Sequence, residues 1–282
     1  MINQKLLVSG AEFFADDFKI NPYYSNSQIN REKAILEHQE IINCFKKAGI
    51  EVIQVEAPAN CQDGVYTANW AITKDNKAVM SRLPKARKAE EPYAEQKLRE
   101  LGYEIYHAPD NLLFSGQGDS LRCGDYLFAG SGYRSEPESQ QFVADTLGLR
   151  LVQLHTKPQL NADGSIHINP ETNHADSFFY DLDLALSVID ENTIAYCPDA
   201  FDEASNQKIE MTPVNKIKVS LEEAQEGFAC NLVSTGKYVI MSNHAPNFQK
   251  ELESRGLICL TPDVTELKKG GGYIRCISLW LN

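Results

Sequence analysis

Hydrophobic and polar positions along the chain recur as a repeating unit. Each unit begins with a short apolar strand, passes through a polar turn into a helix with apolar residues three and four positions apart, and returns in a second apolar strand. Gly follows several of these helices, as is typical of a left-handed C-terminal cap, whereas the unit that begins at Thr193 lacks that Gly and is weaker. We expect helices over residues 32–48, 93–101, 138–147 and 248–254.

A further apolar segment with unusual polar residues follows each unit. Five repeats of strand, helix, strand and further strand can close into a ring in which each repeat covers the apolar face of its neighbour. Such a ring is an α/β fold in one domain over residues 1–282, and a plain open α/β sheet with polar edges is the alternative. In the ring, the further strands would point one set of side chains towards a common centre: Asn69, Asp119, Asp181, Asp183, Asn231 and Cys276.

Two long polar loops interrupt the repeats, over residues 13–30 and 159–177. Loops beyond about 15 residues are often lids or binding loops. Either loop could therefore cover the centre of the ring.

The amino-acid composition mainly excludes certain classes of protein. Hydrophobic residues make up 43% of the 282 residues, and no apolar run approaches the roughly 20 residues needed to cross a bilayer. The net charge of −12 repels phosphate backbones and anionic lipid, so we expect neither nucleic-acid binding nor membrane association. The start of the chain does not resemble a signal peptide, which favours a cytoplasmic protein with reduced thiols.

The seven cysteines include no CxxC pair, and the histidines do not gather near acidic residues at metal-ligand spacing. We therefore expect no metal and no cofactor. Cys276 is distinctive because it follows the segment GGGYIR in an apolar stretch. Glycines let a backbone approach a ligand closely, and a cationic substrate could supply the charge that ionises a thiol. The alternative is a buried cysteine with a structural role.

Asp181 and Asp183 lie two residues apart in YDLDLALSV, which places both on one face of a strand. Two carboxylates on one apolar face are costly to bury unless a cation or hydrogen bonds compensate, so the pair indicates a cationic organic ligand or an exposed strand end. Asp119 could accept hydrogen bonds from a ligand amine, and Arg134 could bind a carboxylate or form a surface salt bridge. Four histidines are candidates for a general base: His107, His155, His174 and His244.

The chain resembles the guanidine-modifying enzymes of the pentein superfamily, which include dimethylarginine dimethylaminohydrolases, arginine deiminases and dihydrolases, and amidinotransferases. The resemblance runs the whole length and implies a five-fold pseudosymmetric α/β propeller. It rests on six segments in the family's order: INPYY at Ile20, VYTANWA at Val65, FSGQGDSL at Phe114, SGYRSE at Ser131, DLDLALSVI at Asp181 and GGGYIRCISL at Gly270.

The resemblance also implies a role for each matched residue. Cys276 matches the nucleophile that attacks the guanidinium carbon and leaves a covalent thiouronium, and Asp183 matches an acid that binds the guanidinium nitrogens. Asn69 falls where many members carry a guanidinium-binding Asp, and the TAN sequence there is similar to the arginine dihydrolases. Arg134 matches an arginine that binds the substrate carboxylate, and Asn21 resembles a loop residue near the substrate in the dihydrolase branch.

Two positions depart from the family's pattern. The family's catalytic His falls at Asp181, and the Glu that orients it falls at Ser115. Burial beside Asp183 could raise the pKa of Asp181 enough for it to act as acid and base. Otherwise His174 or His244 substitutes for the missing imidazole, the alignment of these two positions with the family is shifted, or activity is lost.

The resulting hypothesis is a cysteine-dependent hydrolase of the guanidinium carbon of arginine or a derivative. The alternatives are transfer of the amidino group to another amine and a catalytically silent binding protein for a cationic amino acid. The expected partner is a small cationic guanidino or amidino compound, and the protein could be a monomer or a homodimer. The catalytic residues of the hypothesis are Cys276 and Asp181, and its substrate-binding residues are Asp183, Asn69, Asp119, Arg134 and Asn21.

Overall fold

The computed structural model describes residues 2–25, 28–130, 132–170 and 173–281. Within these residues the strands form five three-stranded sheets. In strand order, the sheets are β15 (Leu279–Leu281), β1 (Lys5–Val8) and β2 (Glu51–Gln54); β3 (Ala71–Lys74), β4 (Lys77–Met80) and β5 (Glu104–His107); β6 (Ser120–Cys123), β7 (Tyr126–Gly130) and β8 (Arg150–Leu154); β9 (Leu186–Asp190), β10 (Thr193–Tyr196) and β11 (Asn215–Lys218); and β12 (Val233–Ser234), β13 (Tyr238–Ile240) and β14 (Ile258–Leu260).

Every sheet follows the same plan. The central strand pairs antiparallel with one neighbour and parallel with the other. A parallel pair needs a crossover connection, and in each sheet a helix supplies it. These five helices are α1 (Arg31–Lys47), α2 (Glu90–Glu100), α4 (Pro137–Leu147), α5 (Glu203–Met211) and α7 (Pro246–Ser254).

Shorter helical turns complete the chain. They are the α-helical turns α3 (Gly116–Asp119) and α6 (Leu221–Gln225), and the 3-10 turns η1 (Pro22–Ser25), η2 (Thr67–Trp70), η3 (Lys85–Arg87), η4 (Leu182–Leu184), η5 (Pro198–Ala200) and η6 (Leu267–Gly270).

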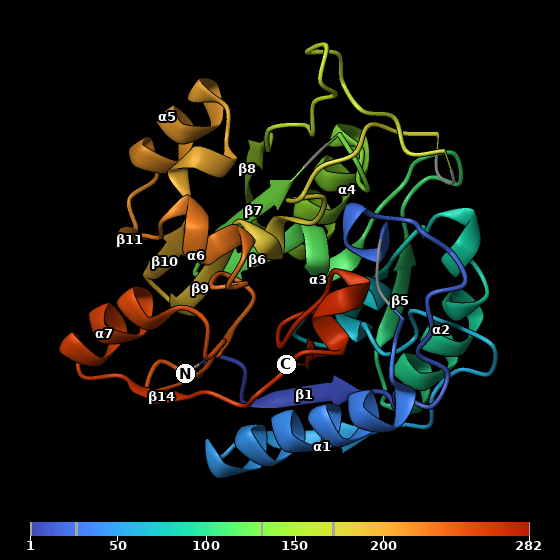
Figure 1. The fold of residues 1–282 in the computed structure, drawn as a ribbon. Coiled ribbons are helices and arrows are strands. Elements are labelled where there is room, and N and C mark those ends of the chain that lie inside the picture. The colour runs from blue at the N-terminus through green and yellow to red at the C-terminus, as the bar shows by residue number, and fades with distance from the viewer. Residues whose placement is uncertain (1, 26–27, 131, 171–172, 282) are drawn as a thin grey trace.

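The two ends of the chain close the five sheets into a ring. Strand β15 pairs antiparallel with β1, with Lys5 opposite Leu281, so the first sheet takes its innermost strand from the C-terminus. Innermost strands of neighbouring sheets contact one another, as β6 does with β9 and β9 with β12. In Figure 1, the five crossover helices lie around the outside and the red C-terminal segment lies in the middle. The ring predicted from the repeats is confirmed, and the open sheet is not the fold.

The predicted helices are confirmed within three residues at each end. Helix α1 was expected over 32–48 and is Arg31–Lys47, and α2 was expected over 93–101 and is Glu90–Glu100. The weaker unit at Thr193 is also present as β10, α5 and β11. Its helix ends at Thr212 in extended backbone, where α4 ends at Gly148 with φ 64°. That difference explains the missing Gly.

The core lies where the helices cover the sheets and where the sheets meet. Leu7 of β1, Trp70 and Leu98 belong to one buried apolar cluster together with Leu279 of β15. Residues from the two ends of the chain therefore share a core with the second sheet. This packing supports the closed ring.

Both long loops lie at one end of the ring. In the first loop, the Asn21 side chain donates a hydrogen bond to the carbonyl of Gly270 (2.9 Å). The Tyr23 hydroxyl donates to the carbonyl of Phe178 (3.0 Å), and Asn169 donates to the carbonyl of Lys19 (3.2 Å). The second loop thus packs on the first, and the first packs on the glycine segment that precedes Cys276.

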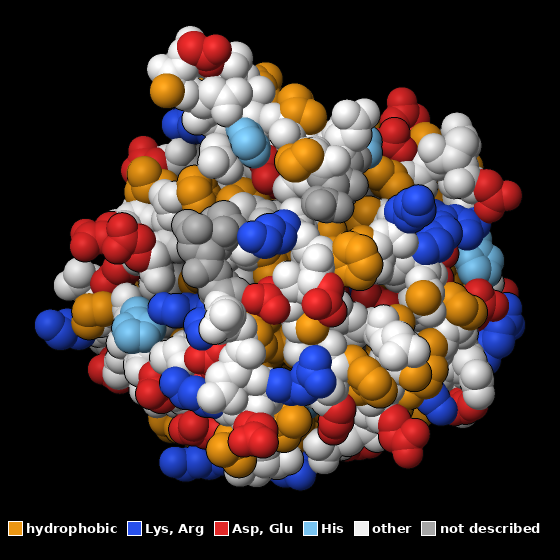
Figure 2. All heavy atoms as spheres, turned by 45° about the vertical axis from the view of Figure 1, so that its right-hand side comes forward, with side chains coloured by type: hydrophobic (Ala, Val, Ile, Leu, Met, Phe, Trp, Pro, Cys, Tyr) orange, Lys and Arg blue, Asp and Glu red, His pale blue; other side chains and the backbone are white. Residues whose placement is uncertain are grey.

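Acidic and basic side chains are interspersed on the face shown in Figure 2. On this face the acidic side chains do not gather into one continuous patch. Within the described part of the chain, no helix is both long and apolar enough to cross a membrane.

Candidate active site

The polar residues predicted to face a common centre lie in turns, each just before an innermost strand. Asn69 lies in η2 before β3, and Asp119 lies in α3 before β6. Asp183 lies in η4 before β9, Asn231 precedes β12 and Cys276 precedes β15. All five are buried, so the repeats bring them to equivalent places at one end of the inner strands.

The prediction that Asp181 and Asp183 share one face of a strand is wrong. The amide of Leu184 donates a hydrogen bond to the carbonyl of Asp181 (3.2 Å), which closes a 3-10 turn, and β9 begins only at Leu186. Cys276 likewise lies in a turn, not in a strand. The turns matter because they allow side chains two residues apart to take different neighbours.

The Cys276 thiol lies between a carboxylate and an amide. Its Sγ is 3.3 Å from Oδ2 of Asp183 and 3.1 Å from Nδ2 of Asn231. The preceding glycines let the chain turn tightly: Gly271 has φ 85°, and a Cβ on Gly272 would lie 2.4 Å from the ring of Tyr66. A larger residue at either position would displace the loop that carries the thiol.

The Asp181 carboxylate accepts hydrogen bonds from two neighbours. Asn69 donates to Oδ2 (2.7 Å) and the Ser115 hydroxyl donates to Oδ1 (3.2 Å). Arg87 in turn donates to Oδ1 of Asn69 (2.7 Å) and pairs with Glu90 (2.7 Å). This chain of contacts holds the Asn69 amide with its nitrogen towards Asp181.

Sequence reasoning missed Arg87. It lies in the basic segment PKARK, which is typical of a solvated turn, yet its side chain is only 5% exposed. Burial alone would lower the pKa of Arg87, but the Glu90 carboxylate outweighs this and raises it. No pattern in the segment distinguishes the buried arginine from its exposed neighbours.

Burial dominates the acid–base properties of the site. It raises the pKa of Asp183 and of Asp119 well above the ordinary value, and the Asp181 carboxylate raises both further. It also raises the pKa of Asp181, although Arg134 and the Asn69 hydrogen bond lower it. The pKa of the Cys276 thiol is raised well above its usual range by burial and then by the two neighbouring acids.

Such a cluster is suited to a cation. Positive charge placed among buried carboxylates favours their ionised forms and lowers the pKa of a nearby thiol. Among the residues that the structure describes, Oδ1 of Asp183 has no hydrogen-bond partner although it is buried. A carboxylate oxygen in this position could accept a hydrogen bond from a ligand nitrogen.

The remaining predicted binding residues lie around the same cluster. The Asp119 carboxylate accepts from the amide of Leu182 (3.0 Å). The Arg134 guanidinium lies 4.8 Å from the ring centre of Tyr180, whose hydroxyl donates to the carbonyl of Gly271 (3.0 Å). Asn21 is held against the glycine segment, as described above. Arg134 is thus a buried residue rather than one in a surface salt bridge.

The four candidate histidines do not join the cluster. His107, His155, His174 and His244 are all exposed, whereas Cys276 is 2% exposed. His107 lies 3.3 Å from Glu95 on the surface. The structure therefore offers no imidazole from among these four in place of Asp181.

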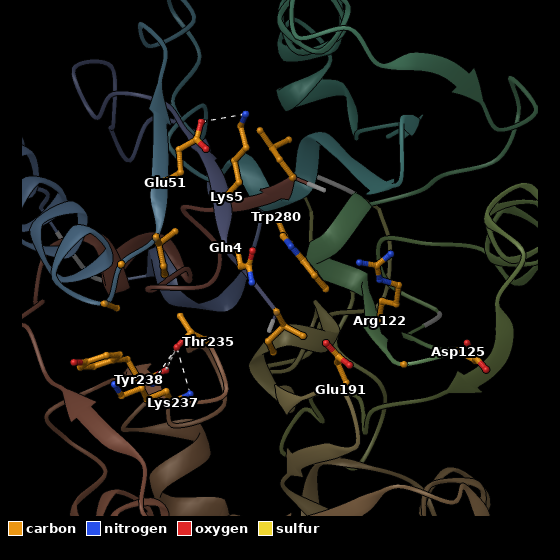
Figure 3. A pocket seen from close by; sticks show the side chains of 16 residues that line it. Gln4, Lys5, Glu51, Arg122, Asp125, Glu191, Thr235, Lys237, Tyr238 and Trp280 are labelled. Atoms are coloured by element: carbon orange, nitrogen blue, oxygen red, sulfur yellow. Dashed lines mark hydrogen bonds and ion pairs between the residues drawn. The ribbon is translucent and has the colours of Figure 1, made fainter.

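Among the described residues, no group of three or more His, Cys, Asp or Glu side chains could hold a metal ion. A separate cavity of about 1030 Å³ lies elsewhere, and Figure 3 shows Arg122, Glu191 and Lys237 at its wall. Arg122 lies near the end of β6, and Glu191 and Lys237 lie in the hairpin turns after β9 and β12, so the cavity lies at the other end of the inner strands from Cys276. Its wall carries charges of both signs and none of the predicted site residues.

The fold and the buried cluster together define a class of protein: a five-module α/β propeller with a cysteine and several carboxylates at one end of its inner strands. Comparison with known proteins makes the class specific. The family model described as "N,N dimethylarginine dimethylhydrolase, eukaryotic" matches residues 8–280. The chain therefore belongs to the dimethylarginine dimethylaminohydrolase family, and the predicted resemblance to the guanidine-modifying enzymes is confirmed.

Two curated relatives illustrate the range of the family. The bifunctional arginine dihydrolase/ornithine cyclodeaminase AgrE of a Nostoc species is 30% identical over 281 residues, which cover 98% of this chain and 37% of AgrE. The chain therefore spans a little more than a third of that relative. The dimethylarginine dimethylaminohydrolase of Mycobacterium tuberculosis is 29% identical over 269 residues, with 95% of this chain and 82% of the relative covered.

Solved structures agree with the fold. The N-terminal domain of the arginine dihydrolase ArgZ with bound substrate superposes with a TM-score of 0.87 at 29% identity, covering 98% of this chain and 97% of that domain. A second structure of that domain holds a covalently bound reaction intermediate. The dimethylarginine dimethylaminohydrolase of Pseudomonas aeruginosa has a TM-score of 0.78 at 15% identity, covers both chains fully and supports the fold alone.

Proposed function

We propose that this protein is a cysteine-dependent hydrolase that acts on the guanidinium carbon of arginine or an arginine derivative through a covalent thiouronium. One observation carries the proposal: the Cys276 thiol lies 3.3 Å from the Asp183 carboxylate in a buried, acid-rich site. Family membership supports it, because the named relatives are hydrolases of guanidino carbon–nitrogen bonds. The same proposal treats residues 1–282 as one propeller domain.

In this proposal the buried acids bind the cation. Asp183 and Asp119 accept hydrogen bonds from the guanidinium nitrogens, and Asn69 lies beside them. Arg134 binds the carboxylate of the amino acid, and Asn21 lines the site from the first long loop. The substrate's own charge then lowers the pKa of the Cys276 thiol, which burial otherwise raises.

The first half of the reaction forms the covalent intermediate. Cys276 gives its proton to Asp183, and Sγ bonds to the guanidinium carbon. Asp181, which burial favours in its protonated form, gives a proton to the departing nitrogen. The carbon–nitrogen bond breaks, the amine leaves and a thiouronium remains.

The second half consumes water. A water molecule bonds to the thiouronium carbon and gives one proton to Asp181. The carbon–sulfur bond breaks and the sulfur regains its proton from Asp183, which restores both acids. The second proton of the water passes to the solvent, where it protonates the amine released in the first half, and the product carries a urea group.

The contact between Ser115 and Asp181 supports this role for Asp181. The two positions to which the resemblance assigns the family's Glu and His are joined in this protein by a hydrogen bond of 3.2 Å. In this proposal, Asp181 and Ser115 do the work of the family's His and Glu, and Asn69 supplies a second donor to the Asp181 carboxylate. Both donors favour the carboxylate that accepts a proton from water.

The test is release of ammonia or amine from arginine, methylated arginines, agmatine and citrulline. Wild-type protein should release product, and Cys276→Ala should abolish release while leaving thermal unfolding almost unchanged. Asp181→Asn should slow turnover by about 10²–10⁴-fold, the usual contribution of a general acid–base. Release by Cys276→Ala equal to wild type would overturn the proposal.

The panel also separates the alternatives. Amidino transfer would give product only when a second amine is supplied. A binding protein would bind arginine equally well after Cys276→Ala and release nothing. The cytoplasmic location and the choice between monomer and homodimer stay predictions.

A further inference from the structure

Three backbone amides of the loop that carries Cys276 converge on one side chain from another module, that of Asn231. The backbone amides of Tyr273, Arg275 and Cys276 all donate to Oδ1 of Asn231, at 3.1, 3.0 and 3.2 Å. Asn231 is fully buried. One oxygen thus satisfies three buried amides of a segment that forms neither helix nor strand.

These three contacts also decide which way the amide group of Asn231 points. The opposite orientation would set its NH₂ group against three N–H donors, which cannot bond to it. Nδ2 therefore faces the other way, where it lies 3.1 Å from Sγ of Cys276 and 3.3 Å from the carbonyl of Asp183. The side chain links the position of the loop to a donor aimed at the sulfur.

The arginine next to Cys276 in the sequence does not supply this hydrogen bond. The Arg275 guanidinium donates to Oε1 of Gln117 (2.7 Å) and to the carbonyl of Ser278 (2.9 Å). The other neighbour of the sulfur is the Asp183 carboxylate, which disfavours a thiolate. The Asn231 amide is therefore the side-chain donor that the structure places on Sγ within the described residues.

We propose that Asn231 is a positioning residue for the nucleophile: its oxygen fixes the loop, and its nitrogen donates a hydrogen bond that stabilises the sulfur anion. This inference rests on the proposed function only in that Cys276 is the nucleophile. It adds a residue from the turn before β12 to a site otherwise described by acids from the turns before β6 and β9.

Asn231→Asp separates the two halves of this role. The carboxylate keeps an oxygen for the three amides and almost the same volume, but it replaces the N–H donor with a second acceptor. The measurement is the rate of iodoacetamide alkylation of Cys276 between pH 6 and 11, followed by mass spectrometry of the peptide that contains it. Cys259, which lies on β14 and is half-buried, serves as the internal reference in each sample.

The variant should raise the apparent pKa of Cys276 by at least one unit, slow its alkylation at pH 8 at least tenfold and leave Cys259 unchanged. Asn43→Asp is the matched control, since Asn43 is exposed on α1 and accepts a hydrogen bond from Gln39 that the new carboxylate can keep. Asn43→Asp adds the same charge and should leave the apparent pKa and the alkylation rate of Cys276 unchanged.

An unchanged Cys276 profile in Asn231→Asp overturns the inference. If that variant does not accumulate as folded protein, Asn231→Ser is measured instead, because its hydroxyl can accept from the loop but is too short to reach the sulfur. An unchanged profile there overturns the inference equally. A shifted profile with no guanidine hydrolysis by wild type would refute the proposed function and leave this inference standing.

Discussion

At Asp63, a single buried residue behind the site, burial and neighbouring groups have opposite effects on the pKa of the carboxyl group. Its carboxylate accepts a hydrogen bond from the Tyr24 hydroxyl (2.5 Å) and lies near Arg87, which braces Asn69. Burial raises the pKa of Asp63 to about 6, although Arg87 and the Tyr24 hydroxyl lower it. Ionisation of Asp63 is thus less favourable in the folded protein than in the unfolded chain, and this makes the stability of the protein depend on pH.

Asp63→Asn should remove that dependence. An acid whose pKa is higher in the folded than in the unfolded chain contributes stability that is full below its unfolded pKa of about 4 and is lost as pH rises through its folded pKa. A difference of about two units corresponds to about 3 kcal/mol. The free energy of unfolding of wild type, relative to Asp63→Asn, should therefore fall by roughly that amount between pH 4 and pH 8.

Urea unfolding at the two pH values measures this difference. Asp125→Asn is the matched control because Asp125 is exposed, and wild type should keep the same stability relative to it at both pH values. If the stability of wild type relative to Asp63→Asn rises with pH, Asp63 is stabilised as a carboxylate and the argument is wrong.

At the scale of elements, the turns before the inner strands build the site. Gly118 in α3 lies against two residues of the site. A Cβ at this position would lie 2.3 Å from Nδ2 of Asn69 and 2.8 Å from Oδ2 of Asp181. Neither neighbour can withdraw freely, since Asn69 is also bonded to Arg87 and Ser115. The turn therefore requires glycine for reasons of space.

Gly118→Ala should disrupt the site more than the fold. Inserting a methyl group into a packed region typically costs about 1–3 kcal/mol, and we expect guanidine hydrolysis to fall at least a hundredfold because Asn69 and Asp181 must separate. Gly49→Ala is the control: Gly49 has φ 82° but nothing within 4 Å of an added Cβ, so it should lose about 1 kcal/mol and keep full activity. Equal losses of activity in the two variants would contradict this account.

The elements also show what the sequence could reveal. The crossover helices were predictable because their apolar spacing and capping residues are local signals. The turns at Asp181 and Cys276 were not predictable, because alternating hydrophobic and polar residues give the same pattern whether they precede a strand or lie within it. In DLDLALSVI the ladder begins at Leu186 only because Tyr196 lies opposite, a partner that periodicity does not identify. Likewise, Arg87 is buried because it contacts Glu90 and Asn69. Neither contact can be recognised from the order of hydrophobic and polar residues in the sequence.

At the scale of the molecule, the β1–β15 pair decides whether the ring is closed. The two strands come from opposite ends of the chain, and the thiol lies shortly before one of them. Joining the two ends should therefore reduce the stability of the fold only slightly, provided that the new break lies outside the β-sheets and outside the hydrophobic core. The exposed turn at Asp163 and Gly164 meets that condition. It belongs to the second long loop, which projects at the top of Figure 1.

A circular permutant that joins residues 2 and 281 through about six Gly and Ser residues and opens between Asp163 and Gly164 should fold and keep its function. We expect thermal unfolding within a few degrees of wild type and unchanged alkylation of Cys276, because every sheet keeps its three strands. The control opens instead between Phe128 and Ala129, inside β7, where the break divides the central strand of a sheet, and it should not fold. Equal stability of the two permutants would contradict this account, because it would mean that a break inside the central strand of a sheet is no more costly than a break in an exposed loop.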